Sequence, residues 1–195
     1  MNRGVIGGCR LCMQEGELCN SHIIPEFFYK PLYDELHRCL EVSRFDEPSD
    51  KKTHQKGLRE HLLCAECDNG LLGKHEDYMA RVFFGRSGVS CQQFDEGIIV
   101  ENLSYEHVRL FQLSMLWRAS MSSLPEFSEV ALGPHEESIR EMLLSDDPGE
   151  SDQYPCILCV PSEIRKMLED KAIKMPQTQR LKGHRSYDFY CVRRH

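Results

Sequence analysis

The sequence predicts an α+β fold in which a small, cysteine-rich N-terminal lobe is followed by an appended, mainly helical α+β region. Two cysteine pairs lie in the N-terminal third of the chain, and apolar residues recur at helical spacing in Leu71–Phe84 and in Tyr105–Ser122. A shorter run at Cys91–Asn102 predicts a strand or a hairpin, and one at Tyr187–Val192 predicts a last strand. Helices and strands are thus expected together in one chain, which defines the α+β class.

We expect the cysteine-rich lobe to span residues 1–84 and the α+β region, packed on it, to span residues 85–195. The polar stretch at about residues 40–57 is interpreted as a loop inserted into the lobe. A chain of 195 residues, 41% of them hydrophobic, is long enough to bury one sizeable core.

The composition predicts a cytoplasmic protein that does not associate with membranes. No apolar run approaches the length of a membrane span, and the N-terminus MNRGVIGGCR lacks the apolar stretch of a signal peptide. Because a reducing cytosol keeps thiols free, paired Cys-x-x-Cys spacings among the ten cysteines indicate metal sites rather than disulfides.

Four cysteines have the spacing of a zinc site. Cys9 and Cys12 enclose two residues, as do Cys64 and Cys67, so each tight turn can direct two sulfurs at one tetrahedral ion. In treble-clef sites the first pair lies on a knuckle and the second at the start of a helix, and a long intervening chain adds little loop-closure cost. The spacing predicts one structural Zn²⁺; reduced core thiols are the alternative.

A third pair, Cys156 and Cys159, has the same spacing but lies in a predicted strand, Tyr154–Val160, where alternation separates the two side chains. We interpret the pair as buried thiols. A second zinc site and a thiol-redox role are the alternatives, and the surrounding sequence lacks a thioredoxin-like βαβ pattern.

Local signals mark the ends of the remaining helices. Ser104 is a suitable N-cap for the long helix, and Pro134 suits the first turn of another that Asp147-Pro148-Gly149 ends. A further helix is expected over 162–172. His75 and Glu76, on the helix after the second cysteine pair, are interpreted as an exposed pair.

The charge distribution is uneven. A formal charge of −7 argues against a general nucleic-acid-binding surface. Between Glu126 and Asp152 nine residues are acidic and only Arg140 is basic, whereas from Lys171 onward seven basic residues accompany one acid. The tail, including Arg193 and Arg194, is therefore a candidate for phosphate contacts; a solvated surface of mixed charge is the alternative.

The order Cys9-x-x-Cys12, Ser21-His22-Ile23-Ile24-Pro25, and Leu62-Leu63-Cys64-x-x-Cys67 resembles the HNH endonuclease family, whose ββα-metal fold holds a structural zinc in many bacterial members. The resemblance covers roughly residues 6–84. The pattern is also similar to that of bacterial proteins with SHIIP followed by LLCxxC and a short helix.

The resemblance implies a nuclease in which His22 is the general base that activates water. Asp68 is a further candidate catalytic residue because its carboxylate can bind Mg²⁺ as a hard oxygen ligand, and Asn69 lies close enough in sequence to assist. It implies a catalytic Mg²⁺ or Mn²⁺, a nucleic-acid substrate with DNA favoured over RNA, and a protein partner. HNH-type proteins act beside a partner ATPase in bacterial antiviral defence, among other settings, so the resemblance suggests such a role here.

The sequence departs from the family pattern at three positions. Ser21 stands where an acid usually precedes the histidine, Arg59 where an asparagine usually lies before the second pair, and Asp68 where a histidine is common. The alternative function is therefore a non-catalytic, zinc-stabilised interaction module with a degenerate site, in which the acidic stretch 126–152 recruits a protein.

Overall fold

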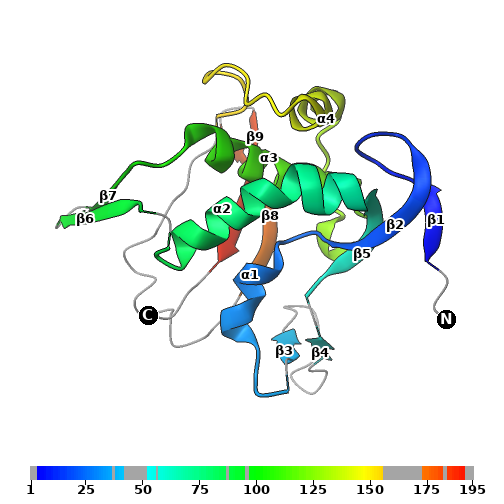
Figure 1. Ribbon diagram of the computed structural model, residues 1–195, viewed down its shortest axis with the longest axis horizontal. Coiled ribbons are helices and arrows are strands. Elements are labelled where there is room, and N and C mark those ends of the chain that lie inside the picture. The colour runs from blue at the N-terminus through cyan, green and yellow to red at the C-terminus, as the bar shows by residue number, and fades with distance from the viewer. Residues whose placement is uncertain are drawn as a thin grey trace.

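The structure is a computed structural model that describes residues 4–36, 38–41, 52–55, 57–86, 88–94, 97–155, 173–181 and 184–191. Within these residues the chain is mixed α+β, with four α-helices and a three-stranded N-terminal sheet. The predicted α+β class is confirmed. Helices α2 and α3 cross the centre of the molecule, with the N-terminal sheet at one end and the β6–β7 hairpin at the other (Figure 1).

The N-terminal sheet has the order β1-β2-β5, with both pairings antiparallel. Its strands are β1 (Val5–Gly8), β2 (Glu15–His22) and β5 (Arg59–Cys64). Strands β1 and β5 form the two edges, and β2, the longest of the three, lies in the centre. The first cysteine pair follows β1 and the second begins at the end of β5, so both pairs are attached to the same small sheet.

A β-bulge shifts the register between β2 and β5. Cys19 lies opposite Leu63, but the next residue, Asn20, lies opposite His61, which leaves Leu62 as the extra residue. A bulge breaks the strict alternation of a strand. Leu62 and Leu63 are therefore both buried although they are sequence neighbours.

The helix after the second cysteine pair begins with a wide π-helical segment, Glu66–Leu72, and continues as α2 (Gly73–Phe83). The helix predicted over Leu71–Phe84 is thus confirmed in most of its length. Before it, α1 (Glu26–Tyr29) and a 3₁₀ turn (Lys30–Leu32) follow Pro25.

An aromatic cluster joins α1 to the central helices. The ring centroid of Phe27 lies 4.3 Å from that of Phe28, 5.6 Å from that of Phe83 and 5.8 Å from that of Phe111. Aromatic pairs at these separations contribute to packing beyond the area that they bury.

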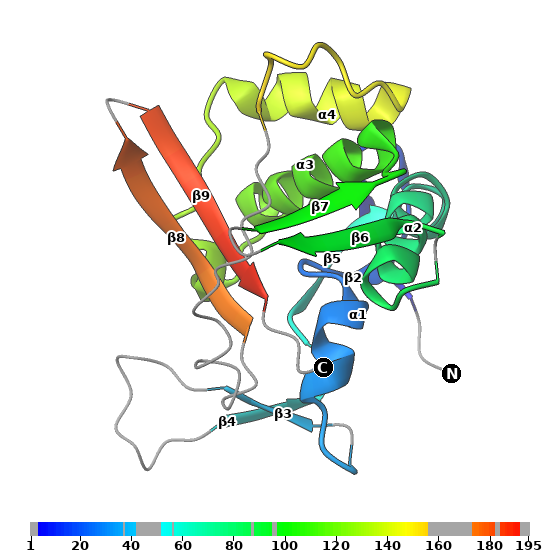
Figure 2. The same ribbon diagram turned by 90° about the vertical axis from the view of Figure 1, so that its left-hand side faces the viewer.

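Helix α3 (Tyr105–Met121) is the central element, and the hydroxyl of Ser104 caps its first turn by accepting from His107 N, as the sequence predicts. The apolar spacing of this helix predicts one buried stripe, made by Val108, Phe111, Met115 and Ala119 with Leu116 alongside. The helix is instead buried around most of its circumference, because it packs against both α2 and α4. Figure 2 shows α3 beneath α4.

Helix α4 (His135–Ser145) follows Pro134 and ends at Asp146, whose φ of 59° is left-handed. This end lies one residue before the predicted stop at Asp147-Pro148-Gly149. Because the C-terminal turn leaves Asp146 pointing back toward α2, its carboxylate reaches Lys74 and His75.

Three further antiparallel hairpins complete the described structure. They are β3 (Arg38–Glu41) with β4 (Lys52–Gln55), β6 (Ser90–Phe94) with β7 (Gly97–Glu101), and β8 (Ile173–Leu181) with β9 (His184–Cys191). The predicted hairpin over Cys91–Asn102 and last strand over Tyr187–Val192 are confirmed. The stretch 40–57 is not all loop, since it includes β4; most of the predicted strand at 154–160 and the helix at 162–172 lie outside the described residues.

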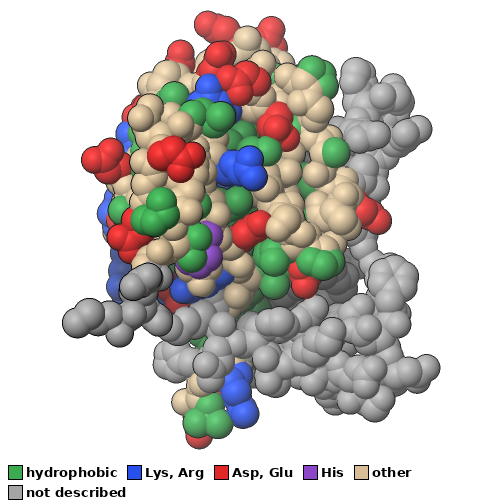
Figure 3. Space-filling model, turned by 90° about the vertical axis from the view of Figure 1, so that its right-hand side faces the viewer, with side chains coloured by type: hydrophobic (Ala, Val, Ile, Leu, Met, Phe, Trp, Pro, Cys, Tyr) green, Lys and Arg blue, Asp and Glu red, His purple; other side chains and the backbone are tan. Residues whose placement is uncertain are grey.

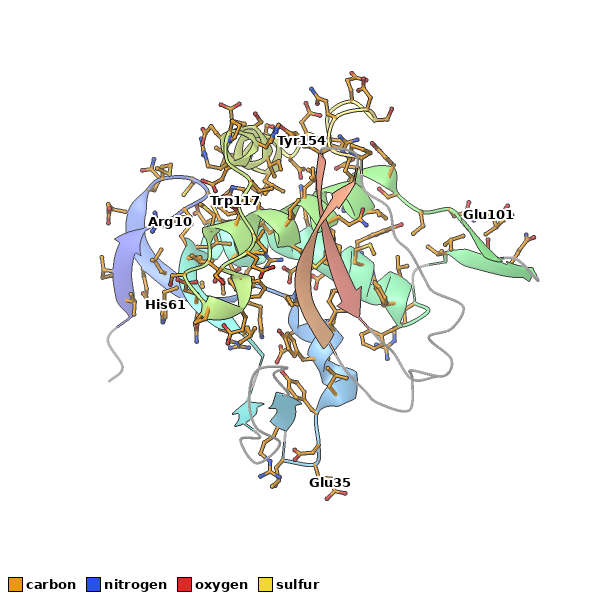
Figure 4. All side chains as sticks on the ribbon, turned by 180° about the vertical axis from the view of Figure 1, so that it is seen from behind. Arg10, Glu35, His61, Glu101, Trp117 and Tyr154 are labelled. Atoms are coloured by element: carbon orange, nitrogen blue, oxygen red, sulfur yellow. The ribbon has the colours of Figure 1, made fainter. Side chains whose placement is uncertain are left out.

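One hydrophobic core joins the two parts of the chain. It includes Cys9 and Leu63 from the N-terminal lobe and Trp117, Ile139 and Leu143 from α3 and α4. Trp117 lies near the middle of the molecule in Figure 4. The boundary at residue 84 stays a prediction. Among the described helices, none is long and apolar enough to cross a bilayer.

Candidate zinc centre and histidine site

The first cysteine pair lies on a tight knuckle between β1 and β2. Cys9 N donates to Gln14 O across 2.9 Å, and Met13 N donates to Cys9 O across 2.9 Å. Met13 closes the turn with a φ of 62°. These bonds fold the chain back within four residues, which brings the Cys12 thiol beside the Cys9 thiol.

The second pair approaches the knuckle from the other side of the sheet. Cys64 is the last residue of β5, and Cys67 lies in the π-helical segment that follows. Arg10 N donates to Leu62 O across 2.9 Å and so ties the knuckle to β5. The order of elements is knuckle, β2–β5 hairpin, helix.

The four predicted ligands, Cys9, Cys12, Cys64 and Cys67, lie close enough to bind one metal ion. Their sulfur atoms are all within 4.8 Å of one another, and Cys12 Sγ and Cys64 Sγ are 3.9 Å apart. Zn–S bonds of about 2.3 Å in a tetrahedron place the sulfurs about 3.8 Å apart. Among the described residues, no other cluster of three or more metal-ligating side chains is found. The site is therefore compatible with zinc.

The thiols themselves need a cation in order to ionise together. Burial disfavours the Cys9 thiolate, but backbone hydrogen bonds from Cys12, Cys64 and Leu11 lower its pKa to about 7. Burial, reinforced by the other thiols, raises the pKa of Cys67. Four adjacent thiolates repel one another, and a bound divalent ion removes that repulsion.

Helix α4 supports the knuckle from outside the N-terminal lobe. Arg140 Nη1 donates to Leu11 O across 2.5 Å, while Glu137 accepts from Arg140 Nε and Nη2 at 2.8 and 2.6 Å. Leu11 is fully buried. The knuckle is thus held between the sheet and α4, a contact between residues 129 positions apart.

His22 lies at the end of β2, directly opposite Arg59 at the start of β5. Cross-strand neighbours in an antiparallel pair have adjacent side chains. Arg59 Nε donates to His22 Nε2 across 2.9 Å, and Arg59 Nη2 lies 3.8 Å from Glu26 Oε1. The β2–β5 bulge fixes this pairing, since a one-residue slip would turn Arg59 to the opposite face.

Arg118 reaches the same place from α3. Its Nη1 donates to the carbonyl oxygen of His22 across 2.7 Å, and its Nη2 lies 2.6 Å from Glu76 Oε1. The side chain is 1% exposed. Burial raises the pKa of Glu76, and the charge of Arg118 opposes that rise. Arg118 therefore joins α3, β2 and α2 through one buried guanidinium.

Of the other two predicted catalytic residues, one joins this cluster and one faces away. Burial raises the pKa of the Asp68 carboxyl, while Arg118, the Ser21 hydroxyl and Arg59 act against that rise. Asn69 is exposed, and its Nδ2 lies 3.9 Å from Cys19 Sγ. We define the His22 cluster as His22, Arg59, Asp68, Glu76 and Arg118.

Comparison of the chain with family models, curated proteins and solved structures finds no match. The geometry of the two sites therefore carries the functional argument.

The interpretation of His75 and Glu76 as an exposed pair is wrong. His75 is 2% exposed, its Nδ1 lies 2.9 Å from His107 Nδ1, and its Nε2 lies 2.8 Å from Asp146 Oδ1. Burial lowers the pKa of His75 although Asp146 favours its charged form. The contact with Asp146, which lies 71 positions away, could not be predicted from the sequence.

Arg118 is the member of the His22 cluster that sequence reasoning missed. The available signal was an arginine within the apolar run of α3, since a charge at a buried helical position needs a partner. The predicted tail contacts, Arg193 and Arg194, and the pair Cys156 and Cys159 lie outside the described residues. The face that carries the N-terminal sheet has acidic, basic and apolar side chains interspersed (Figure 3).

Proposed function

We propose that the chain is an HNH-type endonuclease, in which zinc bound by Cys9, Cys12, Cys64 and Cys67 stabilises a treble-clef lobe and His22 serves as the general base. The observation that carries the proposal is the position of His22 at the end of β2, bonded to Arg59 of β5. The same Arg59 acts on the Asp68 carboxylate, which lies in the helical segment that follows the second cysteine pair.

In the proposed reaction His22 takes a proton from water while the water oxygen attacks phosphorus. The phosphodiester bond to the leaving oxygen breaks, and that oxygen takes a proton from solvent. A Mg²⁺ or Mn²⁺ ion supplies charge stabilisation at the phosphate, and Asp68 is the residue of the His22 cluster with a carboxylate suited to hold it.

The charge of the cluster supports a cation at Asp68 and not at Glu76. Glu76 is already paired with Arg118 at 2.6 Å. Burial raises the pKa of Asp68 although Arg118 and Arg59 oppose that rise, so a cation beside its carboxylate would favour the ionised form further. A single carboxylate with several waters is within the range of Mg²⁺ coordination in proteins.

A specific observation favours the second candidate, a non-catalytic zinc module. The buried Arg118 guanidinium neutralises Glu76 and acts on Asp68, which is the role that a divalent cation would have in an enzyme. In this case the acidic surface of α4 and the following loop, with Glu141, Asp147 and Glu150 exposed, is the part that recruits a protein.

Under either proposal we expect a protein partner, because a chain with a formal charge of −7 gains little from non-specific phosphate attraction. From the resemblance to HNH proteins, we propose that this partner is an ATPase and that the two proteins act together in antiviral defence.

The test is cleavage of supercoiled plasmid, single-stranded DNA and RNA by zinc-loaded protein, with Mg²⁺, with Mn²⁺ and in metal-depleted buffer. His22→Ala is compared with His61→Ala, which removes an exposed histidine from the neighbouring strand. A nuclease predicts metal-dependent cleavage that His22→Ala lowers by about 10²- to 10⁴-fold and that His61→Ala leaves unchanged. Absence of cleavage by the wild type, with and without a partner, would favour the zinc module.

A further inference from the structure

The hydrogen bond between Arg59 and His22 fixes the proton on the histidine ring. Arg59 Nε donates to His22 Nε2 across 2.9 Å. A guanidinium has donors only, whereas neutral imidazole has one donor nitrogen and one acceptor nitrogen. Nε2 is therefore the acceptor, and the proton of neutral His22 lies on Nδ1.

While this bond is made, His22 Nε2 cannot accept a proton from water. A general base needs a lone pair directed at the proton that it removes. The lone pair on His22 Nε2 is directed at Arg59, and Nδ1 carries the ring proton. His22 can therefore accept a proton from water only after Arg59 has moved from Nε2.

Arg59 is the arginine of the cluster that solvent reaches. Its side chain is 23% exposed, and its Nη2 lies 3.8 Å from Glu26 Oε1, at the outer side of the cluster. Arg118 is 1% exposed and bonded to His22 O and Glu76. An anion arriving from solvent consequently meets Arg59 before Arg118.

A phosphate is a stronger partner for Arg59 than the neutral imidazole is. Hydrogen bonds from a guanidinium to an anion are charge-assisted, roughly twice as strong as neutral ones, and are often bidentate on phosphate. The guanidinium therefore gains by leaving His22 for a phosphodiester, provided that the phosphate lies within reach of the same side chain.

We propose that Arg59 is a substrate-responsive gate on His22: the phosphodiester of a bound nucleic acid draws the guanidinium away from Nε2 and so exposes the base where substrate is present. The inference rests on the proposed function for the assignment of His22 as the base. Arg59 stands at the position where HNH proteins usually have asparagine. In the proposed gate its guanidinium alternates between His22 Nε2 and the phosphate of the substrate.

Among the described residues, the charged groups around the gate come from four elements. Glu26 on α1 and Asp68 on the π-helical segment attract the Arg59 guanidinium, whereas Arg118 from α3 repels it, and Glu76 on α2 is paired with Arg118. Glu26 and His22 are among the groups with which a phosphate must compete for Arg59. Glu26→Gln should therefore ease the opening of the gate and strengthen oligonucleotide binding.

The direct test is ¹⁵N NMR of the His22 ring, assigned with His22→Gln, in Mg²⁺-free buffer. A short single-stranded oligodeoxynucleotide is the probe, with binding followed by fluorescence anisotropy. In the wild type we expect the Nε2 resonance to move from a hydrogen-bonded to an unbonded position on binding. Arg59→Met, which keeps the aliphatic stem, should show the unbonded position without the probe; Arg59→Lys should show a partial shift.

Kinetics supply the second readout. Arg59→Met should raise KM by roughly tenfold to a hundredfold, the loss expected for one charge-assisted contact, and change kcat little because the base is already exposed. Arg86→Ala, which removes an exposed arginine outside the cluster, is the matched control.

The outcomes separate the gate from the nuclease. Three results would overturn the gate even if plasmid is cleaved. The Nε2 resonance could be the same in the wild type and in Arg59→Met, it could stay in place when the probe saturates the protein, or the probe could fail to bind. The expected NMR shifts without cleavage under any condition would support the gate as a phosphate-binding device and reject the nuclease.

Discussion

Replacing Arg118 by Met should destabilise the protein strongly, because the guanidinium is a buried charge with fixed partners. Arg118 is 1% exposed and contacts Glu76 Oε1 at 2.6 Å and His22 O at 2.7 Å, with weaker bonds to Ser114. Methionine keeps much of the volume but leaves Glu76, whose side chain is 24% exposed, without its counter-ion.

The expected loss follows from that burial. Removing one partner of a buried ion pair costs about 3–5 kcal/mol. The partial exposure of Glu76 lets its carboxylate gain some hydration or take a proton, so we expect a value near the lower limit, about 3 kcal/mol. That is a large fraction of the ~5–15 kcal/mol by which domains are usually stable.

The assay is urea denaturation of zinc-loaded protein at neutral pH, followed by fluorescence of the single tryptophan, Trp117, which is fully buried beside Arg118. Arg118→Met combined with Glu76→Leu should recover about 2 kcal/mol, because a buried ion pair replaced by apolar residues is often neutral in cost. Arg38→Met is the matched control, since the side chains of Arg38 and Asp34 are 42% and 43% exposed; it should leave the urea midpoint nearly unchanged.

Two results would refute this reasoning. An Arg118→Met loss below about 1 kcal/mol would place the pair in the range of surface ion pairs. A double variant no more stable than Arg118→Met alone would show that the loss comes from packing or from the bond to the His22 carbonyl, and not from an unpaired Glu76.

Three further predictions concern other parts of the molecule. Zinc removal, or Cys64→Ser, should unfold the N-terminal lobe, as measured by metal content and circular dichroism, because Cys9 and Cys67 belong to the core; a folded, metal-free protein would contradict the zinc centre. Because burial lowers the pKa of His75 below its unfolded value of about 6.5, the unfolded state binds more protons at acid pH. Stability should therefore fall as pH decreases below about 6.5, and His75→Gln should flatten that dependence in urea melts, whereas an unchanged slope would exclude His75 as its source. Gly57→Ala should cost about 2–4 kcal/mol in the same melts, since φ is +68° and a Cβ would lie 2.6 Å from the buried Tyr29 ring; a loss below about 1 kcal/mol would mean that the ring moves freely aside.

Local features of this protein follow from residues that are close together in the sequence. The two-residue gaps of the cysteine pairs, the Ser104 cap of α3 and the Pro134 start of α4 are all found where the pattern predicts them. Each depends on residues within one or two turns of one another, so backbone geometry and capping bonds are enough to specify it.

The set of residues that make up the candidate site depends on how distant elements pack together. The sequence indicated that Arg59 replaces an asparagine, but the β2–β5 bulge decides that it lies against His22. Arg118 is 96 positions from His22, and the long α3 that carries it is buried all round by α2 and α4. Such contacts depend on how whole helices and strands pack against one another. The spacing of apolar residues can predict which face of a helix is buried, but it does not predict which elements cover that face.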